Sequence, residues 1–283
     1  MTDMLQTLLR VTIAIFMAGS LLQMGLQLDL KKAASALVDA RFVLTALVWS
    51  FVIGPALAVL LTKLLPLAEP YALGLILLGL APCAPFVPLL SERARADVNY
   101  VAAYLLLAAI GTEIALPVAI PFLAPELSAD PWTISRPLLL FIGLPLVIGI
   151  AIESVRRKLA DRLHPIVKKV TNFDIVVMLG IVLVLYWRDF VGAIGSYAIA
   201  AQFLYYCALA AGAYGLGFGL SHDKRSTLAL GLSTRNVGAA MAPLLSAQNS
   251  DERATVMCIM AVFITLIVGF ATAHLLGRQK PKS

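Results

Sequence analysis

The sequence APCAPFVP at residues 81–88 places three prolines within seven residues, in the middle of an apolar segment. Proline removes a backbone N–H donor and clashes with the preceding helical turn. One proline only kinks a membrane helix, but three this close predict an unwound stretch. Unwound backbone is tolerated within a membrane only where it lines a cavity or is buried in protein. The stretch therefore marks a candidate substrate site, with Pro82, Cys83, Ala84 and Pro85 as its candidate residues.

The composition around this stretch is that of a membrane protein. Of 283 residues, 60% are hydrophobic and 13% are charged, and the mean hydropathy is +0.91. Soluble domains carry about 25% charged residues. These values exclude an ordinary cytosolic enzyme, a nucleic-acid-binding domain and a disordered chain. The net charge of +6 is spread too thinly for a surface that follows a phosphate backbone.

A helix needs about 20 apolar residues to cross a bilayer. The chain contains such stretches at residues 5–28, 41–65, 71–91, 98–124, 136–154, 167–187, 190–220, 227–248 and 254–277. The sequence therefore predicts an all-α membrane protein with nine transmembrane helices. Of the 22 Lys and Arg residues, 16 fall in connectors on one side and five on the other, with Arg235 inside a span. The positive-inside rule then predicts an outside N-terminus and a cytoplasmic C-terminus, in a membrane of the plasma or inner type.

A second interrupted segment, STRNVG at residues 233–238, places Arg235 near the middle of a span. A charge there is costly and usually functional. Ser233, Thr234, Arg235 and Asn236 are therefore candidate substrate-binding residues. The two broken spans also share flanking letters: ALGL at 72–75 and PLLS at 88–91 recur at 229–232 and 243–246.

Because the two broken spans are five apart in a nine-span order, they run in opposite directions. Interrupted helices at matching places in inverted halves point to the binding site of a transporter. This pattern predicts a single membrane domain with a first repeat of four helices at residues 1–126 and a second repeat of five at residues 133–278.

Three segments resemble the bile acid:sodium symporter family. FMAG at 16–19 and MGLQL at 24–28 resemble the first core helix of the family; GLAP at 79–82 through ARADV at 94–98 and residues 227–238 resemble its two crossover helices. The resemblance implies inverted repeats, a core domain that moves against a panel domain, and alternating access with a small organic anion as substrate.

The chain departs from this family at the expected sodium ligands. A Gly-Gly-Thr-x-Ser-Asn pattern is replaced by residues 83–88, and in a Glu-x-Gly-x-Gln-Asn pattern the glutamate becomes Gly231 and the glutamine Arg235, with Asn236 kept. A further glutamine of the family lines up with Ser50, which is a candidate substrate-binding residue here. Hard cations need several oxygen ligands, usually with a carboxylate. We therefore expect the two sodium sites to be absent and no cofactor to be bound, although backbone carbonyls could still hold sodium weakly.

Arg235 has two interpretations. It is either a fixed positive charge that holds an anionic substrate through its forked donors, or half of a buried ion pair. Glu113, in the middle of span 98–124, is the natural partner for that pair. The alternative role of Glu113 is a proton carrier, which would make transport proton-coupled.

Other polar side chains carry weaker signals. Gln23 and Gln27 lie one turn apart, where they could line the substrate cavity or bond to a neighbouring helix. Asp174 is expected at a hydrated edge, and His164 and His222 in loops. The three histidines form no ligand cluster, which predicts no metal site.

No catalytic motif is present: the sequence lacks GxSxG, HExxH and a P-loop, so we expect no catalytic residues and no enzyme activity. The sequence favours a secondary transporter of a small organic anion, coupled to protons or uncoupled. A sodium-coupled carrier with a rearranged ion site is the first alternative. A membrane receptor or scaffold on a transporter fold is the second. The expected partners are the lipid bilayer, the anion and either protons or sodium, but no nucleic acid.

Overall fold

The computed structural model describes residues 2–127, 131–246 and 251–279, and these residues form helices without strands. The π-helical and 3-10 segments are η1 (Trp49–Ile53), η2 (Pro125–Leu127) and η3 (Leu139–Gly143). The α-helices are α1 (Thr2–Gly25), α2 (Leu30–Leu37), α3 (Ala40–Val48), α4 (Gly54–Leu64), α5 (Glu69–Leu80), α6 (Val87–Ala94), α7 (Val98–Leu123), α8 (Pro131–Leu138), α9 (Leu144–Val155), α10 (Arg157–Ala193), α11 (Ala198–Gly215), α12 (His222–Leu232), α13 (Val237–Ser246) and α14 (Glu252–Gln279).

Seven helices are long and apolar enough to cross a membrane. They cover Met4–Gly25, Ala40–Leu64, Val98–Leu123, Ser135–Val155, Arg157–Ala193, Ala198–Gly215 and Glu252–Gln279. The chain is thus an all-helical membrane protein. The two remaining predicted spans, 71–91 and 227–248, contain the pairs α5–α6 and α12–α13, and residues 247–248 lie outside the described part. The count of nine crossings stays a prediction.

Some boundaries differ from those expected. Helix α10 begins at Arg157 rather than at 167, so His164 lies in a helix, and His222 is the first residue of α12. Apolar composition identifies only the part of a helix that lies in lipid, whereas the polar ends of the helix continue into water. For this reason His164 and His222 lie in helices rather than in the predicted loops. Helix α11 begins at Ala198 rather than at 190, because Gly195 and Tyr197 adopt positive φ and turn the chain.

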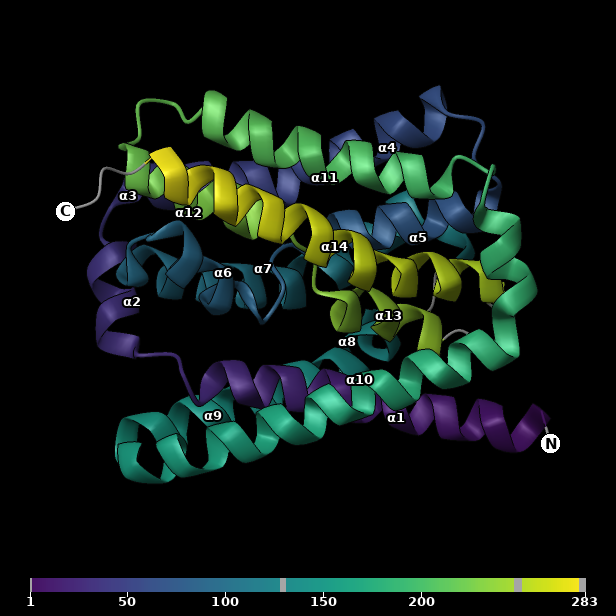
Figure 1. The fold of residues 1–283 in the computed structure, drawn as a ribbon, viewed down its shortest axis with the longest axis horizontal. Helices are drawn as coiled ribbons and strands as arrows, with labels where there is room; N and C mark the ends of the chain where they lie inside the picture. The colour runs from purple at the N-terminus through teal and green to yellow at the C-terminus, as the bar shows by residue number, and fades with distance from the viewer. Residues whose placement is uncertain (1, 128–130, 247–250, 280–283) are drawn as a thin grey trace.

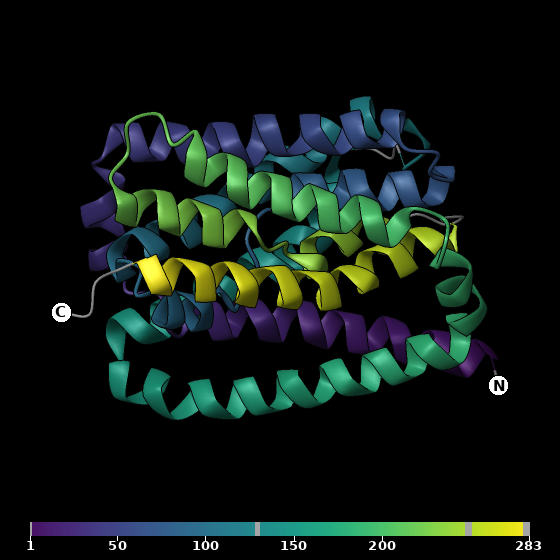
Figure 2. The ribbon, with the colours of Figure 1, turned by 45° about the horizontal axis from the view of Figure 1, so that its top comes forward.

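The helices form two groups (Figures 1 and 2). Helices α1, α9 and α10 pack against one another and form the three-helix layer. Helices α2–α7 and α11–α14 form the main bundle, whose α6, α13 and α14 face that layer. Within the three-helix layer, α1 and α9 approach closely at two glycines, because a Cβ on Gly149 would lie 2.8 Å from the Cα of Gly25.

Helix α1 begins at one end of the bundle and α14 finishes at the other, as Figure 1 shows. The broken pairs α5–α6 and α12–α13 come together between these two ends. This arrangement places their interruptions inside the protein, where the candidate site lies.

Candidate functional site

The two interrupted segments meet and pair through their backbones. The Cys83 N–H donates to the Thr234 carbonyl over 3.2 Å, and the Asn236 N–H donates to the Ala81 carbonyl over 2.9 Å. These bonds form a short antiparallel bridge between Pro82 and Arg235. The unwound backbone of each break thus satisfies the other, as it must away from water.

Side chains at the second break complete this pairing. The Thr234 hydroxyl accepts the Ala84 N–H over 3.0 Å and donates to the Gly231 carbonyl over 2.9 Å. The Ser233 hydroxyl donates to the Leu230 carbonyl over 2.7 Å, and Asn236 Oδ1 accepts the Ala239 N–H over 3.1 Å as an N-terminal cap. The hydroxyls of Ser233 and Thr234 therefore bond to the end of α12, and Asn236 starts α13.

The first break owes its shape to a left-handed residue as well as to its prolines. Cys83 has φ = 67°, a conformation that side chains other than glycine adopt at a cost. In register, this is the position at which the resemblance has its first glycine. Cys83 is buried, and its left-handed backbone turns the chain between Pro82 and Ala84.

Arg235 reaches from the second break into the main bundle. Its side chain is 1% exposed. The Nη2 group donates to the Tyr205 hydroxyl over 2.9 Å, the guanidinium lies 5.0 Å from the centre of the Tyr205 ring, and Nε and Nη1 have no hydrogen-bond partner. The Tyr205 hydroxyl in turn donates to the Gly54 carbonyl over 3.2 Å. The charge is thus held by neutral groups and keeps two unsatisfied donors.

No carboxylate neutralises this charge within the described chain. Each ion pair found there joins other residues, with none within 4.0 Å of Arg235. Glu113 is half-buried on α7 and its carboxylate faces Gly143 of η3 instead. The two residues considered as a buried pair are therefore not joined in this structure.

A cavity of about 390 Å³ lies beside the breaks, between the three-helix layer and the main bundle. Its lining residues are Phe16, Ser20, Gln23, Gln27, Ala84, Pro85, Phe86, Pro88, Leu89, Glu92, Lys168, Thr171, Asn172, Ile175, Arg235, Val237, Val262, Thr265, Leu266 and Phe270. Of the residues singled out from the sequence, Gln23, Gln27, Ala84, Pro85 and Arg235 border this cavity. The other candidate substrate-binding residues (Pro82, Cys83, Ser233, Thr234, Asn236 and Ser50) lie outside its lining.

The model of the sodium bile acid symporter family matches residues 12–192, which is more than half of the chain. The chain belongs to the sodium bile acid symporter family. No curated protein matches it. The members of this family are membrane transporters rather than enzymes. The matched region contains the first break, whereas the second break and Arg235 lie beyond its end.

The glycine at position 231, which departs from the symporter-family pattern, lies against the ring of Tyr104. A Cβ on Gly231, where the family glutamate would stand, would clash with the ring of Tyr104. The Tyr104 and Ser50 hydroxyls share a hydrogen bond of 2.8 Å. An aromatic ring and a hydroxyl pair therefore fill the space beside Gly231. In the described residues, no group of three His, Cys, Asp or Glu side chains could hold a metal ion.

Sequence reasoning missed several residues of the cavity in this symporter-family member. Thr265 of α14 accepts the Arg235 backbone N–H over 3.0 Å, and Lys168, Thr171 and Asn172 line the cavity from α10. Lys168, Thr171 and Asn172 are separated by three and four positions, so they lie on one face of a helix, and this spacing could have predicted them. Asp174 was expected at a hydrated edge and is instead 7% exposed. Burial of Asp174 depends on which face of α10 packs against its neighbours, and the composition of the segment does not show that face.

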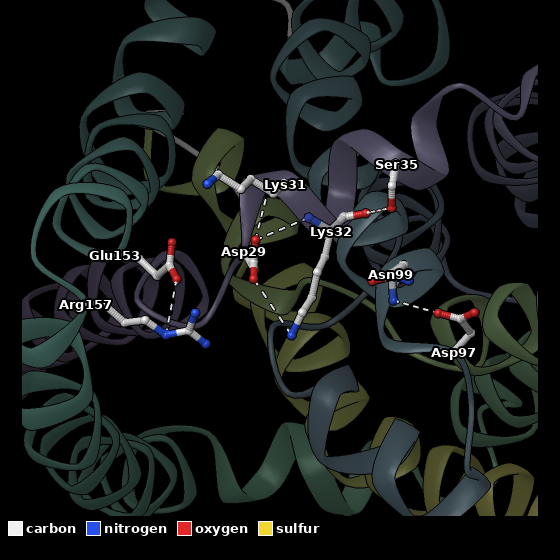
Figure 3. A network of polar contacts seen from close by, with 8 residues as sticks. All are labelled: Asp29, Lys31, Lys32, Ser35, Asp97, Asn99, Glu153 and Arg157. Carbon is white, nitrogen blue, oxygen red and sulfur yellow. Dashed lines mark hydrogen bonds and ion pairs between the residues drawn. The ribbon is translucent and has the colours of Figure 1, made fainter.

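A second, polar cavity of about 260 Å³ lies near the end of the bundle where α14 finishes, and Gln27 lines both cavities. Figure 3 shows four of its lining residues, Asp29, Lys32, Glu153 and Arg157, with neighbouring polar groups. Asp29 accepts the backbone N–H groups of Lys31 and Lys32 over 3.0 and 3.2 Å, and Glu153 lies 4.0 Å from Arg157. The hydrogen bond from the Lys32 backbone holds the pKa of Asp29 below its usual range. These residues form a charged cluster where the three-helix layer meets α2 and α7.

Proposed function

We propose that this chain is a secondary transporter that carries a small organic anion by alternating access. The main bundle would be the mobile core domain, and the three-helix layer the panel domain. The observation that carries the proposal is Arg235, which is 1% exposed, unpaired with any carboxylate of the described chain, and borders the cavity between these two parts.

A buried charge without a counter-ion is costly in a protein interior. Membrane proteins keep such groups where they act on an ion or a substrate. Guanidinium suits carboxylate and sulfonate groups, and two of the Arg235 nitrogens have no partner. An anion in the adjoining cavity would therefore relieve the cost of burying Arg235.

The rest of the cavity suits an apolar body. Phe16 of α1, Phe86 before α6 and Phe270 of α14 line it, and Val262 and Leu266 of α14 add further apolar surface. Aromatic side chains provide large contact areas for apolar groups. The favoured substrate is thus a small carboxylate or sulfonate with an aromatic or branched apolar body.

Sodium binding is less favoured in this chain than the family pattern implies. Tyr104 fills the space beside Gly231, and Arg235 places a positive charge where the resemblance implies a sodium ligand. Two like charges in one buried site repel each other. Arg235 would thus stand in for sodium, and transport would be uncoupled or, through Glu113, proton-coupled. In that role, Glu113→Gln removes the pH dependence of uptake.

The test is uptake of labelled benzoate and 2-naphthoate into proteoliposomes, with and without sodium. Arg235→Ala is expected to abolish saturable uptake, while the matched variant Arg136→Ala, at an exposed arginine on α8, keeps it. Gel filtration and thermal melting check that both variants are folded. Uptake that requires sodium would favour a sodium-coupled carrier with a rearranged site. If the folded protein binds anions without transporting them, a receptor role is favoured.

A further inference from the structure

We propose that the transporter is an exchanger: it moves one monoanion inward in return for one monoanion outward, and it returns empty only slowly. The inference rests on the proposed function and concerns the charge of the moving part. The starting observation is that the Arg235 guanidinium bonds to the neutral Tyr205 hydroxyl, lies against the Tyr205 ring and forms no ion pair within the described residues.

The charge of Arg235 moves with the main bundle. Its backbone is tied to the first break and to Thr265 of α14, and its side chain to Tyr205 of α11. All these elements belong to the main bundle. If that bundle shifts relative to the three-helix layer, the empty transporter carries an uncompensated positive charge through the low-dielectric part of the membrane.

A monoanion in the cavity removes this charge. The loaded bundle then crosses as a neutral unit, and it meets a lower barrier than the empty one. From the cost of a charge at the bilayer centre, we expect exchange to be roughly tenfold to hundredfold faster than net uptake.

Other ionisable groups near the cavity do not supply this neutralisation. Glu92 of α6 lines the cavity and moves with the main bundle, but it is exposed, so water rather than Arg235 solvates its charge, and Lys168 of α10 belongs to the three-helix layer. Asp174 belongs to α10 in the three-helix layer, so it does not move with Arg235. Glu113 also belongs to the main bundle, and its carboxylate faces Gly143 rather than Arg235. The variant Glu113→Gln therefore tests whether this acid contributes to the charge of the moving bundle.

The experiment uses the full-length protein in proteoliposomes with labelled benzoate outside. The vesicles contain either unlabelled benzoate or buffer alone, and valinomycin with potassium gradients sets the membrane potential. We expect uptake to be at least about tenfold faster into vesicles with internal benzoate than into vesicles with buffer alone. The rate of exchange should not depend on the membrane potential. Net uptake should instead accelerate when the inside is positive, by up to roughly tenfold for about 60 mV, because the empty bundle carries its positive charge outward.

Two variants and one substrate pair sharpen the test. Arg235→Lys keeps the charge and should keep the ratio of exchange to net uptake. Glu113→Gln should leave the ratio unchanged. Monomethyl phthalate, a monoanion, should exchange faster than phthalate, a dianion of similar size.

The outcomes separate this inference from the proposed function. Net uptake of wild type as fast as exchange overturns the exchange mechanism and leaves the anion transporter standing. A ratio of exchange to net uptake that falls to one in Glu113→Gln also overturns the exchange mechanism, because Glu113 rather than Arg235 would then determine the charge of the empty main bundle. No uptake of benzoate, 2-naphthoate or monomethyl phthalate in either mode, by a folded protein, overturns both.

Discussion

At the scale of single residues, Arg235 depends on Tyr205. The Tyr205 hydroxyl accepts from the guanidinium and donates to the Gly54 carbonyl, so it holds the charge between the second break and the start of α4. The adjacent Tyr206 is equally buried, but its hydroxyl has no hydrogen-bond partner. The two tyrosines therefore form a matched pair for mutation.

Tyr205→Phe keeps the ring beneath Arg235 and removes both hydrogen bonds. Because it leaves a charged N–H of Arg235 without its partner, we expect a loss of about 1–3 kcal/mol in stability and weaker anion binding. Tyr206→Phe removes a hydroxyl that has no partner, and it should be neutral or slightly stabilising. Thermal melting with and without benzoate measures both effects. Equal effects of the two changes would contradict the role of Tyr205.

Gly231 is the second residue whose role depends on a neighbour. Any side chain there meets the ring of Tyr104, so Gly231→Ala should lower stability by roughly 1–3 kcal/mol, as overpacking does. Tyr104→Ala in the same chain should remove most of the penalty that Gly231→Ala adds. A double-mutant cycle by thermal melting checks this, and additive losses would show that the ring is not the obstacle.

At the scale of elements, one ion pair joins the starts of two helices far apart in sequence. Asp39 caps α3 by accepting the Phe42 N–H over 3.1 Å, and its other oxygen accepts from Lys224 of α12 and from the Tyr100 hydroxyl. The hydrogen bond from Lys224 holds the pKa of Asp39 below its usual range. A lowered pKa in the folded state means that Asp39 stabilises the fold at neutral pH and loses this contribution in acid.

Asp39→Asn keeps a capping side chain and removes the charge. We expect it to lower stability by about 1 kcal/mol at neutral pH, because a half-buried ion pair of this kind contributes modestly. As the pH falls below the ordinary aspartate pKa of about 3.9 and towards the lower pKa of folded Asp39, the difference between the two proteins should shrink. Melting curves between pH 3 and pH 7 test the sign. A difference that grows in acid would contradict it.

At the scale of the whole molecule, the cavity lies at the boundary between the three-helix layer and the main bundle. A ligand there contacts both parts and should stabilise the state that it joins. Because Arg235 supplies the positive charge, that stabilisation should need an anion and not sodium.

Benzoate at about a hundred times its dissociation constant should raise stability by about 2.7 kcal/mol, equally in sodium and potassium buffers. The same anion should have no effect on Arg235→Ala. A thermal-shift series in the two cations measures this. A rise in melting temperature with sodium alone, retained in Arg235→Ala, would show that an ion site exists apart from the arginine.

Much of the fold followed from local chemistry. Three prolines within residues 82–88 interrupt the helix there, and seven of the nine apolar stretches overlap the seven long helices. Helix starts were less accurate, as at α10 and His222, because polar helix ends resemble loops in composition. Of the candidate site, the sequence singled out Arg235 through the cost of its position, but nothing in the sequence pointed to Tyr205 or Thr265 as its neighbours.

The sequence by itself determined that this protein lies in a membrane, that two of its apolar segments are interrupted, and that one interruption carries a charge. These properties depend on composition and on backbone chemistry that act within a few residues. Only the tertiary structure decided that the two breaks bond to each other, that Arg235 bonds to Tyr205 rather than to Glu113, and that Tyr104 fills the space beside Gly231. The physical reason is that these contacts join residues about 30 to 150 positions apart, and side-chain packing between helices selects them.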